Sequence, residues 1–89
     1  MIEIGYSSSF KKAFRKLLKA APEIEEKFWD KIDIFYENPF DIQLKTHKLS
    51  GKLKNLWSFS IDFSIRVIFS FESKDFVTFI DIGTHEDVY

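Results

Sequence analysis

The chain has 89 residues and a mass of 10.6 kDa, which is the size of one domain. It contains no cysteine, so disulfides, thiolate zinc sites and cysteine nucleophiles are excluded. Hydrophobic residues make up 45% of the chain and aromatic residues 18%, which favours a packed core over disorder. No apolar stretch approaches the roughly 20 residues of a transmembrane helix, and the first residues lack the basic start of a signal peptide. We therefore expect a single domain over residues 1–89, outside the membrane.

Charge is distributed unevenly along the chain, although the net charge is only −1. Residues 11–19 carry a charge of +5 and residues 45–54 carry +4, whereas residues 22–41 carry −5 and residues 62–87 carry −4. The two basic segments predict binding surfaces that the net charge conceals. The alternative is that they are the solvated faces of a helix and a loop, and the sequence leaves both interpretations open.

Two helices are predicted after a short first strand at residues 2–6. One of the serines at residues 7–9 can cap the helix that follows. Apolar residues over positions 10–21 recur every three or four residues, which predicts an amphipathic helix. Pro22 ends this helix and suits the first turn of the next, which we expect to end at Asn38. The short break between them predicts an antiparallel helical hairpin.

The second half of the chain predicts a sheet. Residues 39–55 show no sustained period and are expected to form a loop with a turn at Ser50-Gly51. Four apolar residues are expected to anchor this loop to the core: Phe40, Leu44, Leu49 and Leu53. Alternation of apolar and polar residues then predicts antiparallel strands over residues 57–62, 65–72 and 76–82. Apart from Thr78 and Asp81, the last of these strands is apolar on both faces, so we expect it to lie centrally in the sheet or to be covered.

These elements predict an α+β fold of order β-α-α-β-β-β, with the helical hairpin packed on one face of an antiparallel sheet. The opposite face would remain available for function. Arg66 points to that face if Ile65, Val67 and Phe69 point to the helices.

Three motifs in the second half of the chain carry a resemblance to a known family. They are LKTHKLSGKLKNLWSFSI at residues 44–61, SIRVIFSF at residues 64–71 and IGTHEDVY at residues 82–89. In this combination they resemble the RelE/ParE toxin superfamily, in its RelE/YafQ-like branch. The helical hairpin before them fits the same family, so the resemblance covers nearly the whole chain.

The resemblance implies the toxin of a type II toxin–antitoxin pair. Such a toxin is an endoribonuclease that cuts mRNA, usually on the ribosome, and it is blocked by a cognate antitoxin. Operator DNA would be contacted only through the antitoxin, and the location would be cytoplasmic. The implied reaction needs no metal or other cofactor. The ribose 2′-hydroxyl attacks the adjacent phosphate, leaving a 2′,3′-cyclic phosphate and a 5′-hydroxyl.

Two histidines are the candidates for proton transfer in this reaction. His85 matches the histidine of the terminal G-T-H motif, and His47 matches the loop histidine of the family pattern. Histidine suits either proton role because its pKa lies near neutrality. The structural alternatives are that His85 merely closes the last strand and that His47 is bonded to nearby backbone.

Three further residues complete the expected catalytic set. Arg66 matches the strand arginine of the superfamily and would stabilise the developing phosphorane; the alternative is an ion pair with Asp81 or Asp62. Tyr89 occupies the terminal aromatic position, which in the family orients the substrate base; the alternative is packing of the tail. Asp62 is the remaining acid where some relatives carry an additional histidine and aspartate.

Four lysines of the basic loop could hold phosphates without reading sequence, or could simply be solvated. They are Lys45, Lys48, Lys52 and Lys54.

Two other functions compete with RNA cleavage. The first is a weakly active or non-catalytic protein of the same fold, retained as an antitoxin-binding module. The near-neutral charge and the acids Glu86 and Asp87 beside His85 point toward it. The second is a ParE-like inhibitor of DNA gyrase, which the pair of His47 and His85 disfavours because that activity needs no acid–base histidines.

Overall fold

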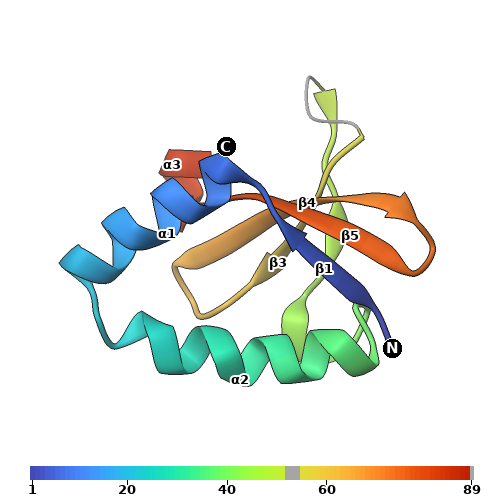
Figure 1. Cartoon of the computed structure of the whole chain (residues 1–89), viewed down its shortest axis with the longest axis horizontal. Coiled ribbons are helices and arrows are strands. Elements are labelled where there is room, and N and C mark those ends of the chain that lie inside the picture. Colours follow the sequence, from blue (N-terminus) through green and yellow to red (C-terminus); the bar gives the residue numbers. More distant parts are fainter. Residues whose placement is uncertain (52–54, 89) are drawn as a thin grey trace.

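A computed structural model gives the fold of the chain and describes residues 1–51 and 55–88. The elements in chain order are β1 (Glu3–Tyr6), α1 (Ser8–Ala20), α2 (Ile24–Glu37), the short 3₁₀ helix η1 (Ile42–Leu44), β2 (His47–Lys48), β3 (Trp57–Ser60), β4 (Ile65–Ser73), β5 (Phe76–Thr84) and α3 (His85–Val88). The two long helices lie against the sheet (Figure 1), which confirms the predicted α+β fold. No helix in the described part of the chain is long and apolar enough to cross a membrane.

The sheet has five strands in the order β1-β5-β4-β3-β2. The antiparallel pairing of β3, β4 and β5 confirms the prediction, and β5 is an interior strand between β1 and β4. The prediction of a wholly antiparallel sheet is wrong, because β1 runs parallel to β5. Alternation along a strand defines its two faces but not the direction of its partner, so the sequence pattern could not show this. The chain between β1 and β5 supplies the long crossover that parallel strands need.

The ends of the two long helices follow local signals in the sequence. Ser7 caps α1, because its Oγ accepts a hydrogen bond from the N–H of Phe10 at 3.0 Å. Asn38 terminates α2, as predicted. Pro22 lies in the turn between the helices, and α2 begins two residues later at Ile24, so the expectation that Pro22 belongs to the first turn of α2 is wrong.

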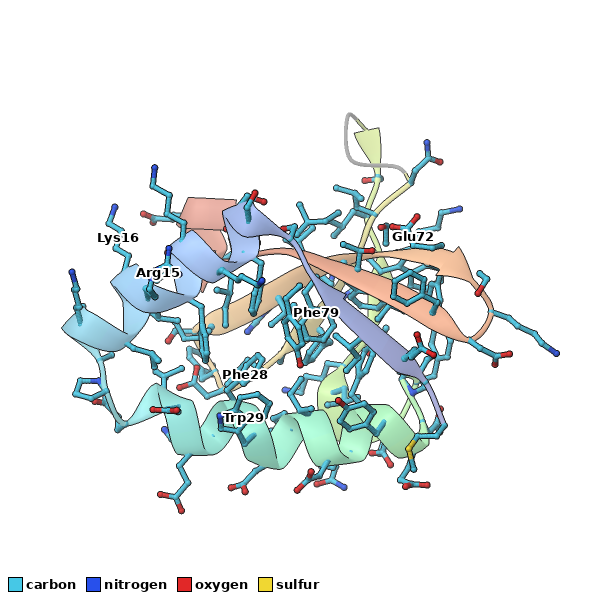
Figure 2. The ribbon with its side chains drawn as sticks, in the orientation of Figure 1. Arg15, Lys16, Phe28, Trp29, Glu72 and Phe79 are labelled. Atoms are coloured by element: carbon cyan, nitrogen blue, oxygen red, sulfur yellow. The ribbon has the colours of Figure 1, made fainter. Side chains whose placement is uncertain are left out.

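Phenylalanine side chains from both long helices and three strands form the core. These residues are at most 1% exposed: Phe10, Phe28, Phe35, Phe59, Phe69 and Phe79. Phe28 of α2 points from the helix toward Phe79 of β5 (Figure 2), with ring centroids 6.4 Å apart. Because Phe10, Phe28 and Phe35 all contact the ring of Phe79, both helices cover the same face of the sheet.

The predicted loop over residues 39–55 contains two elements that the sequence pattern missed, η1 and β2. A strand of two residues is too short for alternation to reveal it. Leu44 is fully buried and anchors this segment to the core as expected, whereas Phe40 is 54% exposed and anchors it less. The predicted anchor Leu53 lies outside the described residues. Gly51 has a φ of +67°, as its place in a predicted turn requires.

Candidate functional site

The face of the sheet away from the helices carries two of the predicted site residues. The strand pairing aligns His47 of β2 with Ser58, Ser58 with Ile68, and Ser60 with Arg66. Directly paired residues of neighbouring strands point to the same face. Arg66 therefore lies on the face predicted for it, and His47 lies on the same face two strands away.

The middle of this outer face is closed to solvent. Ser58 is 0% exposed and Ile68 is 3% exposed, and α3 contacts both β4 and β5. His47 is exposed and Arg66 is half-buried. Less of this face is accessible to solvent than the open surface expected from the sequence, and the candidate functional groups lie at its margins.

His85 lies where β5 passes into α3, and its side chain is exposed. Thr84, the last residue of β5, pairs with Ile65 at the start of β4. His85 is therefore placed at the same end of the sheet as Arg66, which directly follows Ile65. Tyr89 lies outside the described residues.

The ring of His47 is tied to local backbone. Its Nδ1 lies 3.2 Å from the carbonyl oxygen of Lys45. This contact is the structural alternative considered for His47, and it is compatible with catalysis. When the Nδ1–H group donates a hydrogen bond to this carbonyl, Nε2 of the neutral ring is free of hydrogen and can accept a proton.

Asp62 holds the turn between β3 and β4, residues 61–64. Its Oδ1 accepts hydrogen bonds from the N–H groups of Ser64 and Ile65, both at 2.9 Å, and its Oδ2 lies 3.6 Å from the Nζ of Lys27. Burial raises the pKa of Asp62, but the two backbone hydrogen bonds and Lys27 outweigh burial and hold this pKa below its ordinary 3.8. Such a carboxylate is a poor proton acceptor, so these contacts indicate a structural role, and the catalytic role of Asp62 stays a prediction.

Arg66 holds the same turn through its guanidinium. Its Nη1 donates hydrogen bonds to the carbonyl oxygens of Asp62 at 3.0 Å and Phe63 at 3.1 Å, with a longer contact of 3.5 Å to that of Ile65. These bonds all use Nη1, so the guanidinium can still offer Nη2 and Nε to a phosphate.

Neither ion pair considered for Arg66 is found within the described residues. The carboxylate of Asp81 accepts a hydrogen bond from the N–H of Ile82 at 2.9 Å, and that of Asp62 pairs with Lys27. The expected structural partner of Arg66 was therefore wrong, because backbone carbonyls take the place of a carboxylate.

A cleft of about 330 Å³ lies beside the β3–β4 turn. The residues that line it include Lys31, Lys45, Ser60, Asp62, Phe63 and Arg66. Three cations thus share this cleft with one carboxylate, which favours a negatively charged ligand.

Sequence reasoning missed three of these lining residues: Ser60, Lys31 and Phe63. The alternation that put Arg66 on the outer face also puts Ser60 there, so a signal for Ser60 was present. Lys31 belongs to the acidic segment at residues 22–41, where the sum of charges concealed it. No pattern in the sequence marked Phe63.

The lysines of the predicted RNA-binding loop are only partly described. Lys45 and Lys48 are exposed, and Lys45 has a φ of +53° where the chain leaves η1. Lys45 lines the cleft. Lys52 and Lys54 lie outside the described residues.

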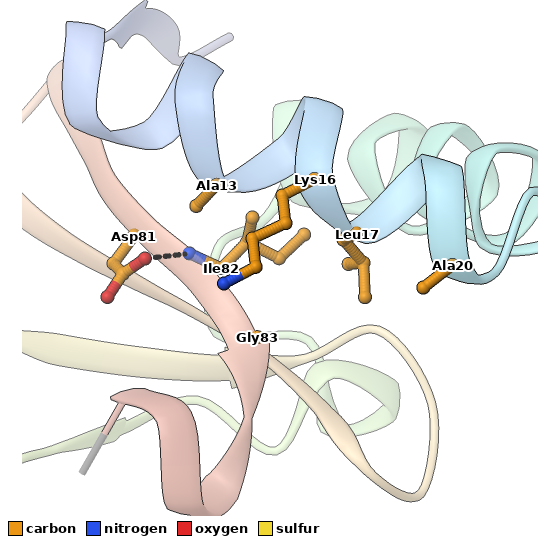
Figure 3. A pocket seen from close by; sticks show the side chains of 7 residues that line it. All are labelled: Ala13, Lys16, Leu17, Ala20, Asp81, Ile82 and Gly83. Carbon is orange, nitrogen blue, oxygen red and sulfur yellow. Dashed lines mark hydrogen bonds between the residues drawn. The ribbon is translucent and has the colours of Figure 1, made fainter.

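A second cleft, of about 370 Å³, lies between α1 and β5 (Figure 3). Ala13, Lys16 and Leu17 line it from the helix, and Asp81 and Ile82 line it from the strand. It shares no lining residue with the cleft beside the β3–β4 turn, although Gly83, which lines it, pairs with Arg66 of β4. Over residues 1–51 and 55–88, no group of three or more His, Cys, Asp or Glu side chains is placed to hold a metal ion.

Comparison with known proteins places the chain in a family. The family model described as a bacterial toxin of type II toxin-antitoxin system, YafQ, matches residues 2–89. The chain belongs to this YafQ family. The resemblance seen in the sequence is thereby confirmed, and the chain is a type II toxin by family.

Solved structures share the fold of this YafQ-family chain at low sequence identity. YafQ from E. coli strain BL21(DE3) is 20% identical with a TM-score of 0.80, over 100% of this chain and 99% of that one. A metal-bound toxin from Helicobacter pylori is 19% identical with a TM-score of 0.80, over 100% of both chains. A chain of the E. coli DinJ-YafQ toxin-antitoxin complex is 20% identical with a TM-score of 0.78, over 99% of this chain and 97% of that one. Among curated protein sequences, none matches this chain.

Proposed function

We propose that this YafQ-family toxin is an endoribonuclease that cleaves mRNA on the ribosome, with protein groups alone carrying the chemistry. The observation that supports this most is the arrangement of His47 and Arg66 on one face of the sheet, with His85 at the end of the neighbouring strand β5. Cleavage by the 2′-hydroxyl needs a base, an acid and positive charge at the phosphorus. These three residues are of the types that supply them.

We assign the proton transfers to the two histidines. One histidine takes the proton of the 2′-hydroxyl as its oxygen attacks the adjacent phosphorus, and the other gives a proton to the departing 5′-oxygen. The products are a 2′,3′-cyclic phosphate and a 5′-hydroxyl. Arg66 would hold the non-bridging oxygens through Nη2 and Nε. Lys45 and Lys48, with Lys52 and Lys54 beyond the described residues, would hold neighbouring phosphates, and Tyr89 would orient a base.

We further propose that a cognate antitoxin blocks this chain and that any contact with operator DNA comes through that antitoxin. One of the solved structures is an E. coli DinJ-YafQ toxin-antitoxin complex, and the matching chain in it aligns with 99% of this chain. The cations of α1 are exposed and offer a surface for an acidic partner: Lys11, Lys12, Arg15, Lys16 and Lys19. We place the protein in the cytoplasm, where mRNA and ribosomes are.

The alternative is a weakly active protein kept to bind its antitoxin. One observation favours it: Asp62 and the Nη1 of Arg66 are both engaged in holding the β3–β4 turn. The catalytic set then rests on the two histidines and the remaining nitrogens of Arg66.

Replacement of His85 tests the proposal. We expect the wild-type chain to arrest growth on induction and to produce mRNA fragments with new 5′-hydroxyl ends. His85→Ala should lower the cleavage rate by about 10²–10⁴-fold, because a general acid–base group contributes that much. The readouts are fragment mapping in cells and cleavage of purified mRNA with and without ribosomes, in the presence and absence of a chelator.

The matched control is Lys74→Ala, which changes an exposed residue of the β4–β5 turn. Both variants should unfold at the denaturant concentration of the wild type. A folded His85→Ala variant that cleaves at the wild-type rate would remove His85 from the mechanism. A wild-type chain that binds an antitoxin and leaves mRNA intact would favour the alternative function.

A further inference from the structure

Phe63 stands at the tip of the β3–β4 turn with 96% of its side chain exposed. A phenylalanine in water forfeits the stabilisation that burial of its ring would give. Single exposed apolar residues are nevertheless common on protein surfaces, so exposure alone indicates nothing. Two other features of this turn give the exposed ring a meaning.

The first feature is that the backbone carrying Phe63 is fixed from several directions. Asp62 accepts hydrogen bonds from the N–H groups of Ser64 and Ile65, and the carbonyl of Phe63 itself accepts from Nη1 of Arg66 at 3.1 Å. The N–H of Ile61 donates to the carbonyl of Ile65 at 2.9 Å, which closes the base of the turn. Only the two side-chain torsions of Phe63 remain to be ordered, so binding of a ligand to the ring costs the protein little conformational entropy.

The second feature is the charge beside the ring. Phe63 lines the cleft of about 330 Å³ together with Lys31, Lys45 and Arg66. These cations come from three different segments of the chain: α2, the residue after η1, and β4. A flat apolar ring next to clustered cations combines the two groups that bind a nucleotide, a surface for the base and charges for the phosphate. An apolar peptide would offer no negative charge to these cations.

We propose that Phe63 is a stacking platform for one base of a single-stranded RNA, and that Lys31 and Lys45 hold, in the adjoining cleft, a phosphate next to the one bound by Arg66. This inference rests on the proposed function, since it names an RNA subsite on the same margin of the sheet. An aromatic ring stacks on any base, so Phe63 contributes affinity and position but little sequence preference. The RNA strand would pass Arg66, with one base stacked on the ring of Phe63 and a phosphate in the cleft beside it.

Binding of a short single-stranded RNA tests the platform without interference from cleavage. Every protein in the test carries His85→Ala, and the RNA contains 2-aminopurine, whose fluorescence is quenched on stacking. Phe63→Ala should weaken binding by about 5- to 150-fold, the effect of losing one stacked base, and should abolish the quenching. Phe63→Trp should preserve both. Lys31→Gln and Lys45→Gln should each weaken binding for all sequences and reduce the salt slope by about 1.

Matched controls come from residues that do not line the cleft. Ile42→Ala removes a side chain that is 90% exposed on η1, and Lys74→Gln removes a cation from the β4–β5 turn. Both should bind RNA as the parent does. Phe63→Leu keeps an apolar side chain but removes the ring, and it should behave like Phe63→Ala.

The outcomes separate this inference from the proposed function. Equal affinity and quenching for Phe63→Ala and the parent would overturn the platform, even if the chain with His85 restored cleaves RNA. Full binding by Phe63→Leu would overturn stacking. A Phe63→Ala variant that binds RNA normally and loses only its protein partner would reassign the turn to a protein interface. Phe63-dependent binding by a chain that never cleaves RNA would support the platform and reject the proposed enzyme.

Discussion

The carboxylate of Asp62 is held in place by hydrogen bonds from the backbone around it. The N–H groups of Ser64 and Ile65 point at its Oδ1, and Lys27 approaches its Oδ2. An aspartate side chain that accepts hydrogen bonds from N–H groups two or three residues later in the chain is a frequent turn-forming arrangement. The sequence Asp-Phe-Ser-Ile was therefore readable as turn chemistry, whereas Asp62 was considered only as a catalytic acid and as an ion-pair partner of Arg66.

The lowered pKa of Asp62 predicts a pH-dependent share of stability. A carboxyl group whose pKa is lower in the folded chain stabilises the fold fully above its unfolded pKa, here near 3.8. That stabilisation is lost as the pH falls through the lowered folded value. We expect Asp62→Asn to reduce the unfolding free energy at pH 7 by about 1 kcal/mol, because a hydrogen bond to a charged group becomes one to a neutral group.

The difference in unfolding free energy between the wild type and Asp62→Asn should become smaller as the pH falls below 3.8. Denaturant unfolding at several pH values measures it. Asp33→Asn, which changes an exposed carboxylate of α2, is the control for the loss of one negative charge. A difference that stays constant down to the acid limit would mean that the charge of Asp62 does not stabilise the turn.

The placement of the candidate site residues was predictable where it depended on alternation. The period of two along β4 put Arg66 on the outer face, and the pairing of β3 with β4 confirms this. The hydrogen-bond partners of Arg66 were not predictable, because they are carbonyl oxygens of a turn whose backbone path the residue types do not specify. Lys31 was missed for a related reason, since only the tertiary fold brings α2 to this cleft.

At the scale of elements, the β3–β4 turn is a unit in which two side chains of opposite charge fix one loop. Asp62 takes the N–H groups of the turn, and Arg66 takes its carbonyl oxygens. The two residues act on complementary backbone groups without pairing with each other, so the loss of either one should loosen the turn that presents Phe63.

Substitution of Arg66 separates the structural role from the catalytic one. Arg66→Ala should lower the unfolding free energy by about 1–3 kcal/mol, because charged hydrogen bonds to two carbonyls are lost. Arg66→Lys should recover part of this stability, since an ammonium can reach a carbonyl, but it loses the bidentate grip on phosphate. RNA cleavage per folded molecule should therefore remain low in Arg66→Lys.

Arg15→Ala is the matched control for Arg66, because it removes an exposed arginine of α1 and should change stability by no more than about 0.5 kcal/mol. Denaturant midpoints and cleavage rates give the two readouts. An Arg66→Ala variant as stable as the wild type would contradict the turn-holding role. Full cleavage by Arg66→Lys would show that only the charge matters.

The sequence predicted those elements whose periods are long and regular. The stripe over positions 10–21 extends for three helical turns, and the alternation at residues 65–72 exceeds the length of a typical strand, so α1 and β4 were found. The two residues of β2 are too few for a period, and α3 is a single turn. The parallel direction of β1 depends on which edge of the sheet the chain reaches, and no local pattern contains that information.

At the scale of the whole molecule, the two faces of the sheet divide stability from function. The inner face buries aromatic rings against both helices, and the outer face presents His47 and Arg66 at its margins. Phe79 on the interior strand β5 joins the parts of the core. It contacts the rings of Tyr6, Phe10, Phe28, Phe35, Phe59 and Phe69, at centroid distances of 5.5 to 6.4 Å.

This arrangement predicts different results for the same substitution in the core and at the exposed β3–β4 turn. Phe79→Ala should lower the unfolding free energy by about 3–5 kcal/mol, because the removed ring is fully buried and leaves a cavity. That is a large share of the roughly 4–13 kcal/mol expected for a domain of this length. Phe63→Ala should change stability by no more than about 0.5 kcal/mol, because the ring is almost wholly exposed. Its effect should fall on RNA binding instead. Thermal and denaturant unfolding of both variants, with RNA affinity measured under conditions where each is folded, decides the matter. If Phe63→Ala destabilised the chain as much as Phe79→Ala, the exposed ring would belong to the core, and the separation of the two faces would be wrong.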